Sequence, residues 1–195
     1  MKDIKRLSRS AAEGPARALG RLGFTPNSLT LIGSVLTASV GLLAAQGWFA
    51  VAGVCLCVFS ALDTLDGALA RATNSVSTFG AFFDSVCDRY ADAAVYFGLM
   101  WWYAVHAEPL GVALAGLALI GSFMVSYARA RAEGLGLQAA EVGWFQRPER
   151  IILLGVGLLI AQFLPVALLW TLAAMAVLTT ITVIQRVLHV RRSAS

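Results

Sequence analysis

The chain has 195 residues, of which 58% are hydrophobic and 13% are charged, with a formal net charge of +4 and a mean hydropathy of +0.75. A soluble domain is typically about 45–50% apolar and about 25% charged, so this composition excludes an ordinary soluble globular protein. The apolar runs are also too long for buried strands or short core helices, which indicates an integral membrane protein without a large soluble domain.

The first two dozen residues, which we treat as a cytoplasmic N-terminal arm over 1–24, are polar and basic. The basic residues in this arm are Lys2, Lys5, Arg6, Arg9, Arg17 and Arg21. Two interpretations fit the arm: one or two short amphipathic helices lying on the inner leaflet, or a solvated basic tail that only sets topology. No cleavable signal peptide is predicted, so the first apolar helix is expected to act as an uncleaved anchor.

The segment "TPNSLT" (25–30) precedes the first apolar run. Thr25 is suited to the N-cap of a helix, and Pro26 is suited to its first position. The free backbone N–H groups at such a helix start favour a phosphate group. Many helices begin in this way, so the pattern alone indicates a helix start and only suggests a ligand.

Six membrane-spanning helices are predicted in an all-α membrane domain over 25–190, followed by a cytoplasmic tail over 191–195. The predicted spans are 29–46, 48–70, 80–105, 109–130, 149–165 and 166–189. The last two are separated because the apolar run from Ile151 is about twice as long as one crossing requires. Gln162 and Pro165 interrupt that run.

The distribution of basic residues predicts the orientation. If the N-terminus is cytoplasmic, all fifteen Lys and Arg lie in the arm, the 71–79 and 130–148 loops, the tail or the adjoining helix ends. The three opposite loops, near Gly47, at 106–109 and near Pro165, contain none. The positive-inside rule therefore predicts a multi-pass protein of the cell membrane, with both termini and the functional site on the cytoplasmic side.

Five aspartates lie in or beside the second and third predicted spans. They are Asp63, Asp66, Asp84, Asp88 and Asp92. The first two are three residues apart and the last three are four apart, so each set lines one face of its helix. The short connection at 71–79 lets the two helices pair antiparallel, so we expect the two acidic faces to meet.

This acidic cluster requires neutralisation, because one carboxylate within a membrane costs about 2.5–3.5 kcal/mol on insertion scales. Basic side chains, protons or metal ions are the possible neutralisers, and Arg71 and Arg89 are the only basic residues close in sequence. Oxygen ligands suit Mg²⁺ or Mn²⁺, and four carboxylates suffice for the two-ion arrangement used in phosphoryl displacement. The alternative interpretation is a set of helix-end charges that extend to the membrane interface.

The spacing of this region reproduces the signature of the CDP-alcohol phosphotransferase family, which the chain resembles. The pattern is Asp63-x2-Asp66-Gly67-x2-Ala70-Arg71-x8-Gly80-x3-Asp84-x3-Asp88. The family also has six helices and an N-terminal juxtamembrane segment. The resemblance implies a membrane enzyme that transfers a phosphatidyl group from a CDP-lipid to an alcohol and releases CMP.

The resemblance also assigns expected roles to individual residues. It implies two divalent cations, Mg²⁺ or Mn²⁺, held by Asp63, Asp66, Asp84 and Asp88, with Asp88 also acting as the general base. Asp92 lies outside the signature, so a structural or supporting role is expected for it. The implied CDP-lipid site comprises Pro26, Asn27, Ser28, Thr30, Asp66, Gly67, Ala70, Arg71, Ser77, Thr78 and Gly80.

Arginines recur at the cytoplasmic ends of the last three predicted helices. Each alone is ordinary topology control, but together they form one phosphate-binding pocket if these helices pack around the aspartates. The segments "SYARARAE" and "RPER" resemble the phosphatidylinositol-phosphate synthases of this family, which use inositol 1-phosphate. On that resemblance the acceptor phosphate is expected to bind Arg129, Arg147, Arg150 and Arg186.

The expected reaction is therefore metal-dependent transfer from CDP-diacylglycerol to a phosphorylated polyol, with inositol 1-phosphate as the first candidate. Glycerol 3-phosphate, as used by a phosphatidylglycerophosphate synthase, is the alternative within the family. A divalent cation transporter is the alternative outside it, although the sequence contains no repeats or broken helices of transporter type. A homodimer is expected from the resemblance, and no nucleic-acid partner is expected.

Overall fold

The computed structural model describes residues 14–15, 18–137 and 142–193, and within these it is helical. The helices are α2 (Pro26–Ala45), α3 (Phe49–Leu62), α4 (Thr64–Ala72), α5 (Thr78–Val105), α6 (Pro109–Gly134), α7 (Arg147–Ala161) and α8 (Val166–Ser193). Most of the predicted amphipathic arm lies outside the described residues, so it stays a prediction. The helices otherwise follow the predicted spans closely, and the predicted break before Val166 is confirmed.

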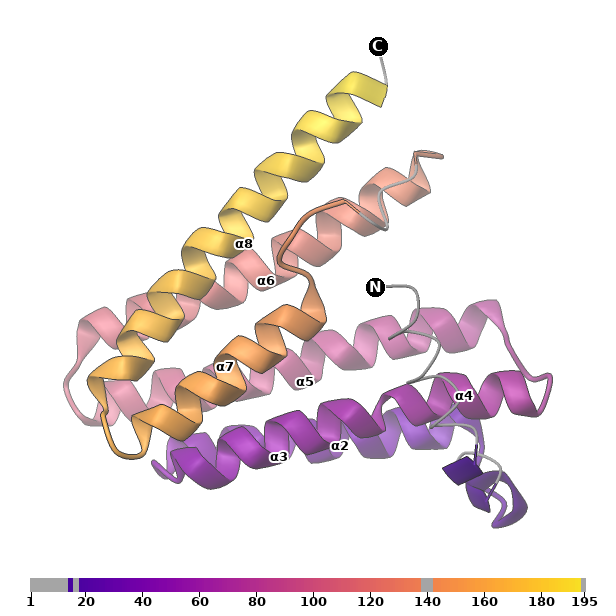
Figure 1. Cartoon of the computed structure of the whole chain (residues 1–195), viewed down its shortest axis with the longest axis horizontal. Coiled ribbons are helices and arrows are strands. Elements are labelled where there is room, and N and C mark those ends of the chain that lie inside the picture. Colours follow the sequence, from indigo (N-terminus) through magenta and orange to yellow (C-terminus); the bar gives the residue numbers. More distant parts are fainter. Residues whose placement is uncertain (1–13, 16–17, 138–141, 194–195) are drawn as a thin grey trace.

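The second predicted span consists of two helices that meet at Asp63. This residue keeps right-handed helical angles, with φ −54° and ψ −27°. Its backbone N–H still donates to the Phe59 carbonyl at 3.2 Å. The chain therefore runs almost straight through the junction, and the first pair of acidic residues lies at the end of α3 and the start of α4 (Figure 1).

Four helical segments among the described residues are long and apolar enough to cross a bilayer: α2, α3 with α4, α6 and α8. The other two predicted spans differ for physical reasons. Helix α5 has 28 residues but carries several charges in its first half, whereas α7 has only 15 residues. The structure thus establishes a membrane-type helical protein, and the count of six crossings remains a prediction.

The helices form one bundle whose outer surface is largely apolar. Helix α5 packs against α2 and α6, α7 packs against α3 and α8, and α6 packs against α8. Side chains such as Leu42, Phe97 and Ile120 are more than 60% exposed. A soluble monomer rarely exposes apolar groups on this scale, so these faces are suited to contact with lipid.

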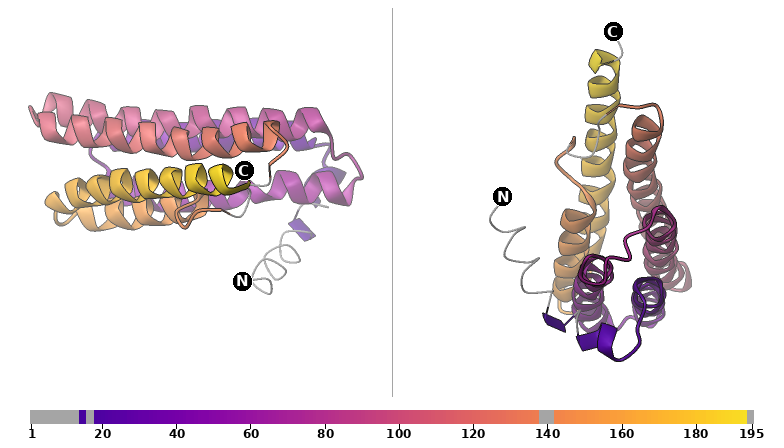
Figure 2. Two further views of the ribbon diagram at one scale, coloured as in Figure 1. Left: turned by 90° about the horizontal axis from the view of Figure 1, so that it is seen from above. Right: turned by 90° about the vertical axis from the view of Figure 1, so that its right-hand side faces the viewer.

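The three short connections lie together at one end of the bundle. They join α2 to α3, α5 to α6 and α7 to α8. From that end α6 and α8 diverge from the layer of α2 to α5, and the α8 end projects farthest (Figures 1 and 2). The N-terminus of α7 lies between the two groups of helices, toward the opposite end, and so faces the α3–α4 junction (Figure 1).

Two glycines bring the backbones of α2 and α5 into direct contact. A methyl group at Gly98 would overlap the carbonyl of Gly41, and one at Gly41 would overlap the carbonyl of Ala94. Small residues permit this approach of helices within membranes. The contact fixes α5, and with it the acidic face of that helix, against α2.

The close contact between α2 and α5 predicts how an added methyl group changes the stability of the protein. Gly98→Ala should lower the free energy of unfolding by about 1–3 kcal/mol, because the added methyl group forces the two backbones apart. Gly116→Ala is the control, since the nearest atom to its added methyl would be Met100 Cε at 4.0 Å. Thermal unfolding of the purified protein in detergent checks both variants, and equal melting temperatures for the two would contradict the packing argument.

Candidate active site

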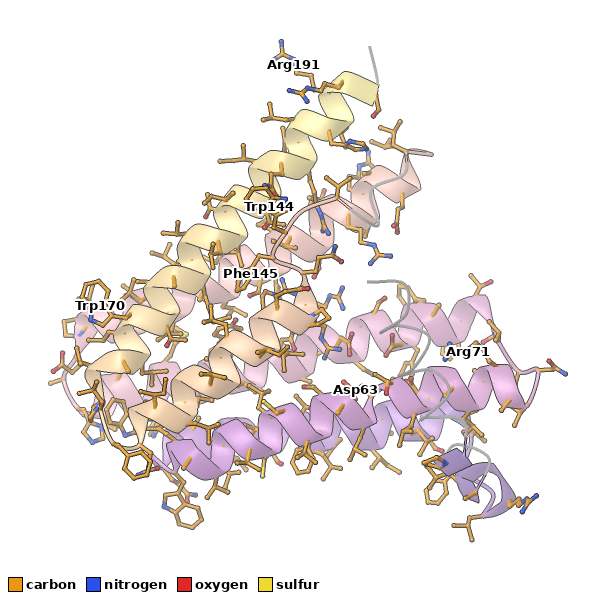
Figure 3. The ribbon with its side chains drawn as sticks, in the orientation of Figure 1. Asp63, Arg71, Trp144, Phe145, Trp170 and Arg191 are labelled. Atoms are coloured by element: carbon orange, nitrogen blue, oxygen red, sulfur yellow. The ribbon has the colours of Figure 1, made fainter. Side chains whose placement is uncertain are left out.

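The two sets of aspartates meet, as the sequence predicts. Asp63 stands at the α3–α4 junction and Asp66 in the first turn of α4, while Asp84, Asp88 and Asp92 follow successive turns of α5. Figure 3 shows Asp63 near the middle of the α3–α4 rod, with Arg71 farther along α4. A single guanidinium contacts Asp63 and two of the α5 carboxylates, which shows that the two acidic faces converge.

That guanidinium belongs to Arg147, the first residue of α7. Its Nη1 lies 2.9 Å from Asp88 Oδ2, and its Nη2 lies 3.4 Å from Asp63 Oδ2 and 3.5 Å from Asp92 Oδ1. Arg89 adds a weaker contact of 3.4 Å with Asp88 Oδ2. A basic residue 84 positions after Asp63 is thus the main counter-ion of the cluster, which sequence spacing did not indicate.

The acidic cluster fits divalent cations by its donor chemistry. Asp63 Oδ1 is buried without a hydrogen-bond partner, and Asp66 and Asp84 line the same cavity of about 410 Å³. Carboxylate oxygens are the ligands that Mg²⁺ and Mn²⁺ prefer. No group of three or more possible ligands is drawn together for coordination among the described residues. Arg147 holds Asp63 and Asp88 instead.

Helix α2 contributes to the cluster in a way that sequence analysis missed. A methyl group at Gly33 would overlap the Asp63 carboxylate, so only glycine leaves space there. Thr30 Oγ1, in the same helix, donates to Asp66 Oδ2 at 2.5 Å. The other Asp66 oxygen accepts from the Gly67 backbone N–H. Both oxygens of Asp66 are therefore oriented by neighbours from α2 and α4.

A second cavity, of about 330 Å³, lies beside the aspartates. Nine of the eleven residues expected to bind the CDP-lipid line it: Pro26, Asn27, Thr30, Asp66, Gly67, Ala70, Arg71, Ser77 and Gly80. Ser75, Val76, Ala81 and Asp84 complete the lining. Ser28 and Thr78 do not line the cavity, so the structure adds nothing to their expected role.

The local structure explains the position of the helix ends around this cavity. Thr25 caps α2, as predicted: Ser28 N–H donates to Thr25 Oγ1 at 3.2 Å, and Thr25 N–H donates to Ser28 Oγ at 3.0 Å. The Ser28 hydroxyl is thereby committed to the cap. Ser77 caps α5 by accepting from the Gly80 N–H at 3.0 Å. Two capped helix starts therefore border the cavity.

The glycines at the cavity leave its interior open. A methyl group at Gly67 would meet only Arg71 Nη1, at 3.3 Å. One at Gly80 would lie 3.3 Å from Asn27 Oδ1 and 3.1 Å from Ser77 Oγ. These positions place polar groups of α2, α4 and α5 around one space large enough for part of a nucleotide.

The four arginines expected to bind the acceptor do not form one open pocket in this structure. Arg129 is half-exposed and pairs with Glu133 at 2.9 Å. Arg147 pairs with the aspartates. Arg150 is buried and donates to the Ser122 carbonyl at 2.7 Å, and Arg186 is buried and donates to the carbonyls of Val142 and Val125. Their role toward an acceptor stays a prediction.

Arg147 and Arg150 nevertheless share a small cavity of about 20 Å³ with Asp92 and Tyr96. The Tyr96 hydroxyl is 3.0 Å from Ser122 Oγ, in the same residue whose carbonyl accepts from Arg150. This space holds little more than one water molecule. Two guanidinium groups thus lie next to each other at the edge of the acidic cluster.

The chain is similar to known proteins in sequence and in fold. The sequence model of the CDP-alcohol phosphatidyltransferase family matches residues 24–184. The archaetidylinositol phosphate synthase of Pyrococcus horikoshii is 41% identical over 180 residues, which cover 90% of this chain and 88% of that protein.

The fold is also similar to solved structures of the phosphatidylinositol phosphate synthase of Mycobacterium tuberculosis. One has CDP-DAG bound and another is a complex with manganese and citrate. Both match with a TM-score of 0.85 at 36% identity over 92% of this chain, covering 92% and 88% of the solved chains respectively.

The contacts of Arg186 predict a large structural contribution. Arg186→Lys should lower the free energy of unfolding by about 1–3 kcal/mol, because one amine is a poor replacement for a fork that reaches two carbonyls, one buried and one partly buried. Arg129→Lys is the matched control and should change it by less than about 1 kcal/mol, because its pair with Glu133 is exposed. Thermal unfolding in detergent separates the two, and a similar loss for both would contradict the structural role of Arg186.

Proposed function

Because the chain belongs to the CDP-alcohol phosphatidyltransferase family, we propose that it transfers a phosphatidyl group from CDP-diacylglycerol to inositol 1-phosphate. The products are phosphatidylinositol phosphate and CMP. One observation carries the proposal: the aspartates of α3 to α5 converge beside a cavity lined by nine residues expected to bind the donor. The relatives' names support the choice of an inositol phosphate as acceptor.

The donor nucleotide occupies the cavity between the starts of α2 and α5. Asn27 and Thr30 provide polar groups from α2, and Arg71 provides a positive charge for the pyrophosphate. Gly67 and Gly80 leave room for close approach of the nucleotide to the backbone. A solved relative with CDP-DAG bound supports this donor.

Two divalent cations complete the site, with Asp63, Asp66, Asp84 and Asp88 as the ligands. When bound, Mg²⁺ or Mn²⁺ neutralises the charge on the pyrophosphate and on the departing CMP. The buried Asp63 oxygen without a partner and the all-oxygen donor set support this assignment. The manganese complex of a solved relative supports it independently.

The transfer reaction releases a proton from the acceptor hydroxyl, and a residue of this chain must accept it. The acceptor hydroxyl oxygen forms a bond to the phosphorus that carries the diacylglycerol, and the bond from that phosphorus to the bridging oxygen breaks, so CMP leaves with that oxygen. Asp88 accepts the hydroxyl proton. It is suited to this because it is buried, one helical turn from Asp84, at the convergence of α5 with α7.

The acceptor binds next to Asp88, on the side of α7. We assign its phosphate group to Arg147 and Arg150, which line one small cavity that must widen to admit it. Arg129 on α6 and Arg186 on α8 are the further arginines expected to bind it. Arginine's fork suits a phosphate dianion, which favours a phosphorylated polyol over a neutral alcohol.

The membrane arrangement belongs to the same proposal. We assign six crossings, with α5 and α7 added to the four segments that are apolar enough by themselves. The end with the three short connections contains no Lys or Arg in residues 46–48, 106–108 and 162–165, so it faces outward. The active site then faces the cytoplasm. The exposed apolar faces also leave room for a homodimer, the assembly expected from the family resemblance.

A CMP-release assay tests the acceptor. The rate of CMP release by the purified protein is measured with CDP-diacylglycerol and Mn²⁺ or Mg²⁺. Inositol 1-phosphate, free inositol and glycerol 3-phosphate are compared as acceptors. We expect a kcat/KM for inositol 1-phosphate at least about a hundredfold above that for free inositol, because the lost phosphate contacts are charge-assisted. Preference for glycerol 3-phosphate would show that it is the acceptor in place of inositol 1-phosphate. Ion flux into liposomes without CMP release would contradict the proposed transferase reaction and favour a transporter.

Substitution of the proposed base makes a separate prediction. Asp88→Asn should lower kcat by about a hundredfold or more, because an amide cannot accept the proton, while CDP-diacylglycerol still binds the neighbouring cavity. Glu108→Gln removes one negative charge at the opposite end of the bundle and serves as the control. Turnover and donor affinity are measured together, and retained turnover in Asp88→Asn would remove Asp88 from the role of base.

A further inference from the structure

Arg147 and Asp92 form a pair that the family signature does not include. Asp92 Oδ1 is 3.5 Å from Arg147 Nη2, and the Asp92 side chain is only 14% exposed. The same Nη2 also lies 3.4 Å from Asp63 Oδ2, while Nη1 contacts Asp88. One partly buried guanidinium is therefore shared by three carboxylates, of which Asp92 alone has no proposed part in cation binding.

A guanidinium and a divalent cation compete for two of these carboxylates. Asp63 and Asp88 are proposed cation ligands, so neither is free to bind a cation fully while it pairs with Arg147. Two positive charges also repel each other strongly at such distances in a partly buried site. Cation binding must therefore weaken the contacts of Arg147 with Asp63 and Asp88, but it leaves the Asp92 contact available.

We propose that Arg147 is the resident counter-ion of the cation-free site and that Asp92 is the positioning residue that retains it once cations bind. The inference rests on the proposed function, because it uses the proposed ligands. With cations bound, Arg147 keeps one carboxylate partner in place of three. Its surplus charge then lies next to Arg150, where the acceptor phosphate is proposed to bind.

This arrangement couples the two ligands. Cations release Arg147 for the acceptor phosphate, and by linkage the acceptor phosphate strengthens cation binding by the same factor. Before cations bind, the arginine is occupied by carboxylates and attracts phosphate weakly. Cations and acceptor phosphate therefore bind cooperatively.

Cation affinity in the absence of any lipid or acceptor tests the role of Arg147. Mn²⁺ binding to the full chain in detergent micelles is measured by electron paramagnetic resonance. Arg147→Gln should bind Mn²⁺ about fivefold more tightly or better, because the competing charge is gone. Arg147→Lys should fall between it and the unmodified protein, because lysine keeps the charge but not the fork.

The control for charge alone is Arg129→Gln, which removes the same charge from a residue paired with Glu133. It should change Mn²⁺ affinity by less than about twofold, because exposed charges are screened. Unchanged affinity in a folded Arg147→Gln variant, or equal gains in both variants, would overturn the inference. Absence of Mn²⁺ binding to the unmodified protein would instead contradict the proposed function.

A double-mutant cycle tests Asp92. Asp92→Asn should weaken Mn²⁺ binding on the order of threefold, since Arg147 then pairs only with the proposed ligands, and this loss should disappear in the Arg147→Gln background. Equal losses in both backgrounds would show that Asp92 acts as a simple negative charge.

The acceptor kinetics provide a second measurement for Asp92. Asp92→Asn should raise the KM for inositol 1-phosphate more than it lowers kcat, and Asp92→Glu should restore much of the KM because it keeps the carboxylate. If Asp92 were purely structural, Asp92→Asn would instead lower kcat and thermal stability together, and the KM for inositol 1-phosphate would change no more than kcat.

Discussion

The structure depends on the neutralisation of five carboxylates gathered between helices of a membrane protein. Each carboxylate is unfavourable there unless a positive charge lies close to it. Arg147 brings that charge from α7 to the faces of α4 and α5. Its contacts with Asp63, Asp88 and Asp92 therefore do more than balance charge, because they also position the start of α7 against the other two helices. The electrostatics of the site and the packing of the bundle are, in this region, the same set of contacts.

Small residues allow the rest of the bundle to fit around that cluster. Gly41 and Gly98 bring α2 and α5 together backbone to backbone, and Gly33 leaves space for the Asp63 carboxylate. As a result, Thr30 of α2 reaches Asp66 of α4. The donor cavity at the starts of α2 and α5 is thus a direct result of how closely α2 approaches its neighbours.

Sequence patterns predicted the features that depend on local spacing. The acidic faces of α4 and α5 follow from positions three or four apart, and the Thr25 cap follows from turn chemistry. The residues that line the donor cavity were expected only from the family resemblance. The structure also confirmed the break before Val166. The sequence did not indicate that Arg147 pairs with Asp63, because 84 residues separate them. Nor did it indicate that Arg150 and Arg186 bind backbone carbonyls, since those carbonyls belong to α6 and to the connection before α7 and come close only in the folded bundle.

The long separation between the acidic residues and their main counter-ion has a consequence for synthesis of the protein. The ribosome completes α3, α4 and α5 before it reaches Arg147, so these helices enter the translocation machinery without it. Between Phe49 and Val105 the nascent chain contains only two arginines, Arg71 and Arg89. Arg89 directly follows Asp88, and Arg71 lies five residues after Asp66, so both arginines belong to the acidic hairpin itself. The acidic hairpin is therefore synthesised before its main counter-ion, and the pairs of Arg147 with Asp63, Asp88 and Asp92 can form only after α7 has been made.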